Sequence, residues 1–419
     1  MFSIIKRLQP YKDKFQDLSL YMLASLASSL VGIIVNPFLA QGLSHDDYAI
    51  IGYYASFGIL LTPIVTFSLN SYFARNYYRV SEKDRVHIYY TLQSMFLCIG
   101  IVTFLLFYLT YSIYHKLYVN SIPFSPFAIL AFLPQYIGSF YNLYLLKLRL
   151  QNKVKRYCIT TILNNLICAF LSIFVVYIFR FGAVGRLSAI LVNSFLFAIY
   201  SLLISDFKFK WDKTIVNDAL KFCWPLAVSG VLSFFFLGID RPMLERLDDN
   251  YNLGLYNVGL QISSYLAIFG TVLLQTFDPD LYKYTSTNQH KKVFITVIMI
   301  ISLCAIPNFL FISISKPIIG ILTANRYIES ASYANILCLK NIATTFAYVI
   351  SGVLIGYGYS KCELYNKIIG AIISFGIYYL LINNYSFTGA AWGQSLSFIV
   401  MGFISLICLF FMRKHECKA

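Results

Sequence analysis

Ionisable side chains inside long apolar stretches are the residues of this chain whose types and spacing could do chemistry. Asp240, Arg241 and Glu245 lie deep in one such stretch, and Lys340 lies in another. Apolar surroundings penalise an isolated charge, so these groups must pair with opposite charges or line a hydrated cavity. The chemistry that they could support is therefore ion pairing and the binding of a charged group.

The spacing of these residues leaves two interpretations open. Neighbours in a helix point to different faces, so Asp240 and Arg241 should each have a separate partner or reach water. Glu245, four residues after Arg241, could pair with it; such a pair could also merely fix the helix end at the outer interface. Lys340, beside Asn341, could contact a bound anion or extend its ammonium group to the outer interface.

A further group of polar side chains lies at the inner end of the second apolar stretch. Arg75 and Arg79 are spaced four residues apart at its inner end, where most basic residues serve only as topology signals. The alternative is that Arg75, with Asn70 nearby in sequence, belongs to a binding site at the inner mouth.

Neither metal binding nor nucleotide hydrolysis is predicted. The five histidines lie far apart and no CxxC motif occurs. The acidic pairs Asp46–Asp47 and Asp248–Asp249 could hold a metal, but Ser44 lies three residues before Asp47, as in a helix N-cap, so capping is the preferred interpretation. No GxxxxGK[ST] sequence is present. We expect no enzyme activity, no cofactor and no metal.

Helices that cross a membrane must position these side chains. The chain is 58% hydrophobic and only 12% charged, far from the composition of soluble domains. Twelve apolar stretches approach the roughly 20 residues that a bilayer-spanning helix needs. They are expected at 18–40, 48–69, 89–113, 124–146, 158–179, 184–204, 224–247, 253–277, 293–315, 332–356, 367–383 and 388–411.

Charge sets the predicted topology. Most of the 33 basic residues fall in alternate loops, so the positive-inside rule places both termini in the cytoplasm. Because the net charge of +15 is spread over separate loops, anionic membrane lipids are the expected partner and nucleic acid is not.

The sequence contains a weak internal repeat. With an offset of 205, Pro37 and Leu39 fall on Pro242 and Leu244. We therefore expect an all-α membrane protein of about 12 transmembrane helices in two six-helix halves, related by a pseudo-two-fold axis along the membrane normal. The halves are residues 1–205 and 223–419. Residues 206–222 form a cytoplasmic amphipathic segment or, alternatively, a solvated linker.

Four short motifs resemble a known family. Pro37–Tyr48 (PFLAQGLSHDDY) resembles the end of the first helix in Wzx-type polysaccharide flippases, which transport O-antigen and capsule repeat units. Gly238–Arg241 (GIDR), Leu253–Asn257 (LGLYN) and Thr388–Trp392 (TGAAW) resemble motifs of their seventh, eighth and last helices. Ala49 departs from the pattern, which usually has glycine there. The family belongs to the superfamily that includes multidrug (MATE) exporters and lipid II flippases.

The resemblance implies a function. The expected substrate is an undecaprenyl-pyrophosphate-linked oligosaccharide, moved from the inner to the outer leaflet of a bacterial inner membrane by alternating access of the two halves. Its diphosphate would need cations inside a hydrated cavity. The candidate substrate-binding residues are Arg241, Asp240, Lys340, Arg75, Glu245 and Asn70. Candidate protein partners are a polysaccharide polymerase and chain-length regulator proteins.

Two other functions fit the composition. A MATE-like exporter coupled to a cation usually has an acidic residue in its first helix, and Leu18–Leu39 contains none. A membrane-embedded polysaccharide polymerase would need a large outer loop to hold its polymer, and none is predicted.

Overall fold

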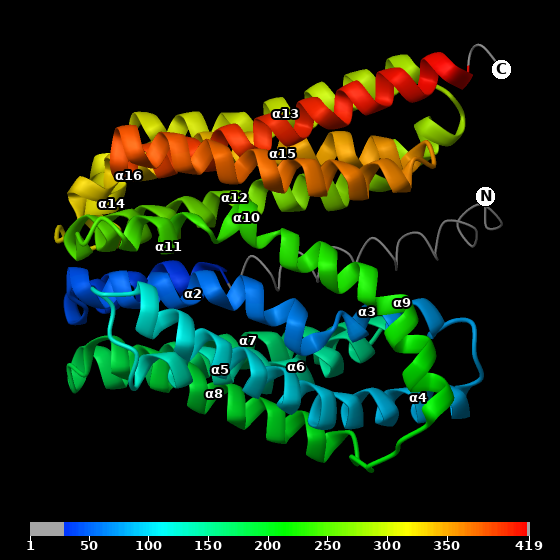
Figure 1. Cartoon of the computed structure of the whole chain (residues 1–419), viewed down its shortest axis with the longest axis horizontal. Coiled ribbons are helices and arrows are strands. Elements are labelled where there is room, and N and C mark those ends of the chain that lie inside the picture. The colour runs from blue at the N-terminus through cyan, green and yellow to red at the C-terminus, as the bar shows by residue number, and fades with distance from the viewer. Residues whose placement is uncertain (1–28, 417–419) are drawn as a thin grey trace, which may run out of the picture. The chain divides into compact units, whose positions relative to one another are not determined.

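The computed structural model describes residues 29–416, and every regular element in that range is a helix (Figure 1). Ten helices are long and apolar enough to cross a bilayer, and a shorter apolar helix, Ser29–Gly42, precedes them. The last of the ten, Cys362–Phe411, contains two of the predicted spans. Ser386, with φ 49° and ψ −128°, interrupts the helix between these two spans. The all-α membrane fold is thus confirmed, although part of the first predicted span, residues 18–28, lies outside the described range.

The described residues form two compact units. Unit 1 contains residues 29–42, Leu61–Ile113 and Phe124–Ala227, and unit 2 contains Leu43–Leu60, Tyr114–Pro123 and residues 228–416. Unit boundaries fall inside three helices, α2 (His45–Thr66), α5 (Ile101–Tyr118) and α9 (Lys213–Leu232). The division into halves 1–205 and 223–419, and the symmetry between them, stay predictions.

Unit 1 is a bundle in which α6 packs against α7 and α8. Two π-helical turns, Phe96–Gly100 and Ile173–Ile178, extend α4 and α7. Besides parts of α2, α5 and α9, its helices are α3 (Leu69–Asn76), α4 (Glu82–Met95), α6 (Phe127–Leu150), α7 (Val154–Ser172) and α8 (Gly182–Ile204).

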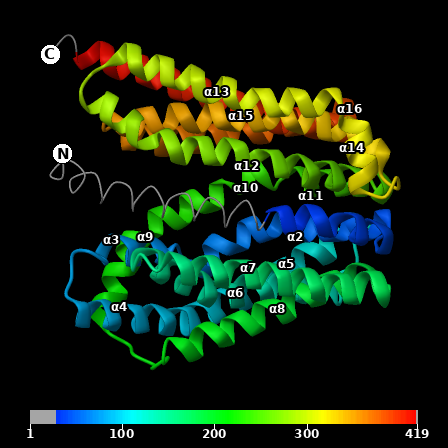
Figure 2. The same cartoon turned by 180° about the vertical axis from the view of Figure 1, so that it is seen from behind.

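Unit 2 is built around α15, which packs against α12, α13 and α16 (Figure 2). Its core between α12, α13 and α15 is aliphatic and includes Leu281, Ile300 and Val349. Its helices are α10 (Phe234–Leu237), α11 (Asp240–Glu245), α12 (Asn250–Ser286), α13 (His290–Ser313), α14 (Ser315–Leu322), α15 (Ala331–Gly356) and α16 (Ser360–Glu416), with a 3₁₀ turn at Ile328–Ser330.

One member of each acidic pair, Asp47 and Asp249, takes part in a helix cap, as predicted. The Asp47 backbone N–H donates to the Ser44 hydroxyl at 3.1 Å, and the Ser44 N–H donates back to the Asp47 carboxylate at 2.8 Å. This reciprocal pattern closes the first turn of α2. At α12, the Asp249 carboxylate accepts the Asn252 N–H at 3.0 Å.

The seventh predicted span, 224–247, differs most from the observed structure. A continuous helix was expected there, but α9 already begins at Lys213, inside the predicted amphipathic segment, and ends at Leu232. The chain then forms α10, breaks again at Gly238 and Ile239, and continues as α11. A side chain at Gly238 would crowd the Phe234 ring and the Ser56 carbonyl oxygen, so the second break lies where the backbone packs too closely for a larger residue.

Candidate functional site

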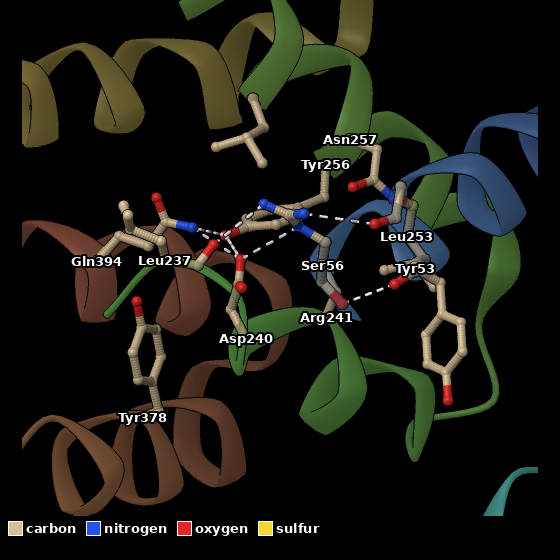
Figure 3. A network of polar contacts seen from close by, with 12 residues as sticks. Tyr53, Ser56, Leu237, Asp240, Arg241, Leu253, Tyr256, Asn257, Tyr378 and Gln394 are labelled. Carbon is tan, nitrogen blue, oxygen red and sulfur yellow. Dashed lines mark hydrogen bonds and ion pairs between the residues drawn. The ribbon is translucent and has the colours of Figure 1, made fainter. Parts of the chain in front are cut away.

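The polar centre of unit 2 is the carboxylate of Asp240, which begins α11 and is completely buried. Its Oδ2 atom accepts hydrogen bonds from the Tyr256 hydroxyl at 2.6 Å and from the Gln394 amide at 2.8 Å (Figure 3). The partners come from α12 and from the last part of α16, so three separate elements meet at one oxygen. A buried carboxylate requires such donors, because losing its hydration would otherwise be costly.

Arg241 pairs with its own neighbour, which corrects the expectation that the two residues need separate partners. Its Nε atom lies 3.7 Å from Asp240 Oδ2. The guanidinium also donates to the Leu237 carbonyl at 3.3 Å and to the Gly52 carbonyl at 3.4 Å. Leu237 is the last residue of α10, so its carbonyl oxygen accepts no hydrogen bond from within that short helix. The break before α11 therefore supplies the geometry that a regular helix would not allow.

Gly52 on α2 permits the close approach that this contact needs. A Cβ atom there would lie about 2.0 Å from the Asn257 side chain of α12. The Asn257 amide in turn donates to the Leu253 carbonyl at 2.9 Å, which fixes its orientation. The first part of α2 is therefore packed directly on α12 beside the Arg241 guanidinium.

Glu245 does not pair with Arg241, contrary to the interpretation from their spacing. Its Oε1 atom accepts from the Asn120 N–H, the Ser121 N–H and the Ser121 hydroxyl, each at 3.0 Å. The side chain is buried and turned toward the loop after α5, where backbone N–H groups need acceptors. Glu245 holds this loop in place, and the Arg241 charge is balanced by Asp240.

Lys340 supplies a second positive charge near the Asp240–Arg241 pair. The charges of both residues act on its ammonium group, and its side chain is partly buried on α15. Within residues 29–416 no acceptor lies at hydrogen-bonding distance of this ammonium. The adjacent Asn341 points elsewhere, donating to the Ser263 carbonyl at 2.8 Å. With all groups ionised, two cations face one carboxylate, which leaves an excess positive charge.

The remaining two candidates lie in unit 1, on α3. Arg75 is exposed, and its guanidinium lies 4.4 Å from the centre of the Phe222 ring, a cation–π contact. Asn70 has a buried side-chain oxygen with no hydrogen-bond partner among the described residues. Five residues apart, the two side chains point about 140° apart around the helix, so they do not form one surface.

Sequence reasoning did not identify two partners of the site, Tyr256 and Tyr378. Tyr256 lies within the LGLYN motif and Gln394 two residues after the TGAAW motif, so the motifs held the available signal. Tyr378 is fully buried and donates to the Phe236 carbonyl at 3.0 Å. Asp240 Oδ1 and Gln394 Oε1 are buried without a hydrogen-bond partner in the described chain, which leaves acceptor capacity for water or a ligand.

The residues described here do not form a metal centre. In the range 29–416, no three His, Cys, Asp or Glu side chains are placed to hold an ion together. With Asp240, Arg241 and Lys340 ionised, the polar side chains of the site carry a net positive charge.

Comparison with known proteins identifies a matching family and several proteins of similar sequence. Residues 15–279 match the model of a family described as polysaccharide biosynthesis proteins. The chain is 24% identical to an uncharacterized membrane protein of Methanocaldococcus jannaschii, over 58% of this chain and 61% of that protein. It is 27% identical to the capsular polysaccharide biosynthesis protein CapF of Staphylococcus aureus, over 46% of this chain and 48% of CapF. These matches thus span about half to three fifths of the relatives' length.

Solved structures with the same fold are membrane transporters. A structure of the lipid II flippase MurJ in an inward closed conformation aligns with a TM-score of 0.71 at 16% identity, covering 93% of this chain and 87% of that one. An inward-facing MATE family multidrug transporter of the MOP superfamily aligns with a TM-score of 0.70 at 14% identity, covering 93% and 95%. At such identities the likeness establishes the fold alone.

Proposed function

Because this chain belongs to the polysaccharide biosynthesis protein family, we propose that it is a flippase for a lipid-linked oligosaccharide. The substrate is an undecaprenyl-pyrophosphate-linked repeat unit, moved from the inner to the outer leaflet for surface polysaccharide such as O-antigen or capsule. The protein acts by binding and reorientation, and it makes or breaks no bond of the substrate.

The observation that carries the proposal is the ammonium of Lys340. It lies within electrostatic range of the buried Asp240–Arg241 pair and has no acceptor in the described chain. A charge that remains unpaired at membrane depth is costly unless a ligand or water meets it. A diphosphate offers several anionic oxygens, which charge-assisted hydrogen bonds from Lys340 and Arg241 would satisfy.

The surrounding residues give each cation a distinct role in this proposal. The Leu237 and Gly52 carbonyls and Asp240 orient the Arg241 guanidinium. Lys340, on a flexible stem, follows the diphosphate as it enters. Arg75, exposed on α3, would attract the substrate at the predicted inner mouth, and alternating access of the two halves would then expose the site to the other leaflet.

Location and partners follow from the same proposal. The chain is a multi-pass membrane protein. The positive-inside pattern supports a location in the inner membrane of a bacterial cell, with both termini in the cytoplasm. A polysaccharide polymerase and chain-length regulator proteins would receive its product at the outer face.

A MATE-like exporter is the competing function, because the MATE fold matches about as well as that of MurJ. The charge of the site favours the flippase. A drug cation would meet the positive charges of Lys340 and Arg241, with a single carboxylate, Asp240, already engaged by three neighbours. An anionic substrate is attracted by the same arrangement.

Surface polysaccharide in strains carrying single variants tests the proposal. Losing one charge-assisted hydrogen bond of about 1.5–3 kcal/mol weakens binding roughly ten- to hundred-fold, so Lys340→Ala and Arg241→Ala should reduce polymer strongly. Lys116→Ala, at an exposed lysine of α5, is the matched control and should leave polymer unchanged. Normal polymer in both site variants, at confirmed expression, would exclude these residues from transport.

A further inference from the structure

An apolar cleft with a volume of about 420 Å³ lies beside α11 in unit 2. One wall is aromatic: the rings of Phe57 and Tyr114 lie 5.9 Å apart, and those of Phe57 and Phe234 also lie 5.9 Å apart. The lining residues Phe375 and Tyr379 of α16 are about half exposed, 47% and 54%. The cleft is therefore open toward the surface that a bilayer would cover.

This cleft is separate from the Asp240 site, although both use α11. Asp240 and Arg241 do not line it, whereas Pro242 and Met243 do. The short helix thus presents charged side chains to the polar centre and apolar ones to the cleft. A molecule in the cleft would pack against the helix that carries Arg241.

Arg246 gives the lining of the cleft a positive charge, beside the Tyr114 hydroxyl. It follows the last residue of α11, is exposed, and is the only lining side chain in the described chain with a charge near neutral pH. The short connection of residues 247–249, which leads to α12, comes directly after it, at the predicted outer interface. An apolar cleft with a cation in its lining fits an amphiphile with an anionic head.

We infer that this cleft binds the prenyl chain of a phosphorylated carrier lipid, with the lipid phosphate at Arg246. The choice of carrier rests on the function proposed above. The volume supports a single chain: 420 Å³ corresponds to about fourteen water-sized groups, at about 30 Å³ each. A phosphoglyceride brings two acyl chains, and a polyprenyl phosphate brings one.

The cleft gives the carrier a place to stay beside the cationic site. The chain packs against Met243 and the aromatic wall, and the phosphate remains at the interface beside Arg246. Since Pro242 and Met243 adjoin Arg241 on α11, occupation of the cleft restrains the helix that holds the guanidinium.

Lipid binding to the purified full chain tests the inference, measured by native mass spectrometry. The probes are geranylgeranyl phosphate, dioleoyl phosphatidylglycerol and inorganic phosphate. Met243→Trp fills the cleft, and Arg246→Ala removes the positive charge from its lining, with Arg246→Lys as the conservative variant. Ile372→Trp places the same ring at a surface position that is 71% exposed and outside the cleft.

The inference predicts one bound geranylgeranyl phosphate per chain, at an affinity at least fivefold above that for phosphatidylglycerol. Met243→Trp and Arg246→Ala should each weaken this binding at least fivefold, Arg246→Lys should retain most of it, and Ile372→Trp should leave it unchanged. Inorganic phosphate alone should not compete. Equal binding of both lipids, competition by inorganic phosphate, or equal loss in Met243→Trp and Ile372→Trp would overturn the inference.

Failure of this inference can be distinguished from failure of the proposed flippase. Suppose that Met243→Trp abolishes prenyl phosphate binding while Lys340→Ala strains make normal polymer. This result would support lipid binding in the cleft and contradict the proposed role of Lys340 in transport. If Lys340→Ala strains lose polymer but lipid binding does not change in Met243→Trp, the flippase site would be supported and lipid binding in the cleft contradicted. A size-exclusion profile shared by Met243→Trp and Ile372→Trp confirms that both variants fold.

Discussion

The Tyr256 hydroxyl donates a 2.6 Å hydrogen bond to the Asp240 carboxylate, and both side chains are fully buried. The bond ties α12 to the first residue of α11, just after the chain has broken its helix at Gly238. Gln394 contacts both members, at 2.8 Å from Asp240 and 3.2 Å from the Tyr256 hydroxyl. The broken seventh helix is thus held by side chains from two other helices.

Removing the Tyr256 hydroxyl should destabilise unit 2 more than removing a comparable hydroxyl elsewhere. Tyr256→Phe deprives a buried carboxylate of a donor, at a cost of about 1.5–3 kcal/mol. Tyr378→Phe, the matched control, loses a bond to the neutral Phe236 carbonyl, worth about 1 kcal/mol. Thermal unfolding in detergent measures both. Equal shifts in Tm would show that the charge of Asp240 does not determine the stability of this network.

Close packing of α2 on α12 should make Gly254 intolerant of a side chain. A Cβ atom there would lie 2.2 Å from the His45 carbonyl oxygen, a backbone atom that cannot move aside easily. We expect Gly254→Ala to cost about 1–3 kcal/mol and to lower Tm. Gly376→Ala, where no atom lies within 4 Å, should be neutral or stabilising by up to about 1 kcal/mol. Similar Tm values for the two variants would contradict this packing.

Glu245 should control the loop after α5. Glu245→Ala leaves the Asn120 and Ser121 N–H groups without their acceptor, so these amides should exchange with solvent faster. Glu245→Gln retains an oxygen acceptor and should have a smaller effect. Hydrogen exchange at the two amides measures the difference. Unchanged exchange in Glu245→Ala would mean that the contact contributes nothing to the order of the loop.

The start of α9 should loosen only in acid. Hydrogen bonds to the Asp212 carboxylate, first from the Thr214 hydroxyl and then from His87, lower the pKa of Asp212 well below its ordinary value. A lowered folded-state pKa means that this stabilisation is complete above the unfolded-state pKa and is lost as the pH falls toward the folded-state value. Hydrogen exchange at Thr214 and Ile215 should therefore accelerate only below about pH 4. Asp212→Asn should remove this dependence, and an identical pH profile in that variant would contradict the assignment.

The membrane-spanning helices could be predicted from the sequence, because a bilayer imposes a minimum apolar length on each span. The caps at Ser44 and Asp249 could be predicted too, since N-caps depend on residues only three positions apart. The interruptions of the seventh span could not. No neighbouring residue in the sequence indicates that the helix breaks at Ser233. The break at Gly238 is explained by close packing against Ser56, which is far away in the chain.

The partners inside the site were least accessible to sequence reasoning. Asp240 accepts a hydrogen bond from Gln394, which lies 154 positions later in the chain. Arg241 donates to the carbonyl of Gly52, which lies 189 positions earlier. Helical spacing counts only local neighbours and therefore offered Arg241 as a possible partner of Glu245. The actual donors to Glu245 lie 124 and 125 positions away. The motifs indicated the right helices without showing which atoms meet.

Translocation in proteoliposomes that contain only the purified protein tests the central claim most directly. A fluorescent oligosaccharide linked to polyprenyl diphosphate is placed in one leaflet, and its appearance in the other is followed by a quencher that cannot cross the membrane. We expect transport by the unaltered chain and by Lys116→Ala, and at least tenfold slower transport by Lys340→Ala and Arg241→Ala. Transport at the unaltered rate by the folded Lys340→Ala and Arg241→Ala variants would contradict it.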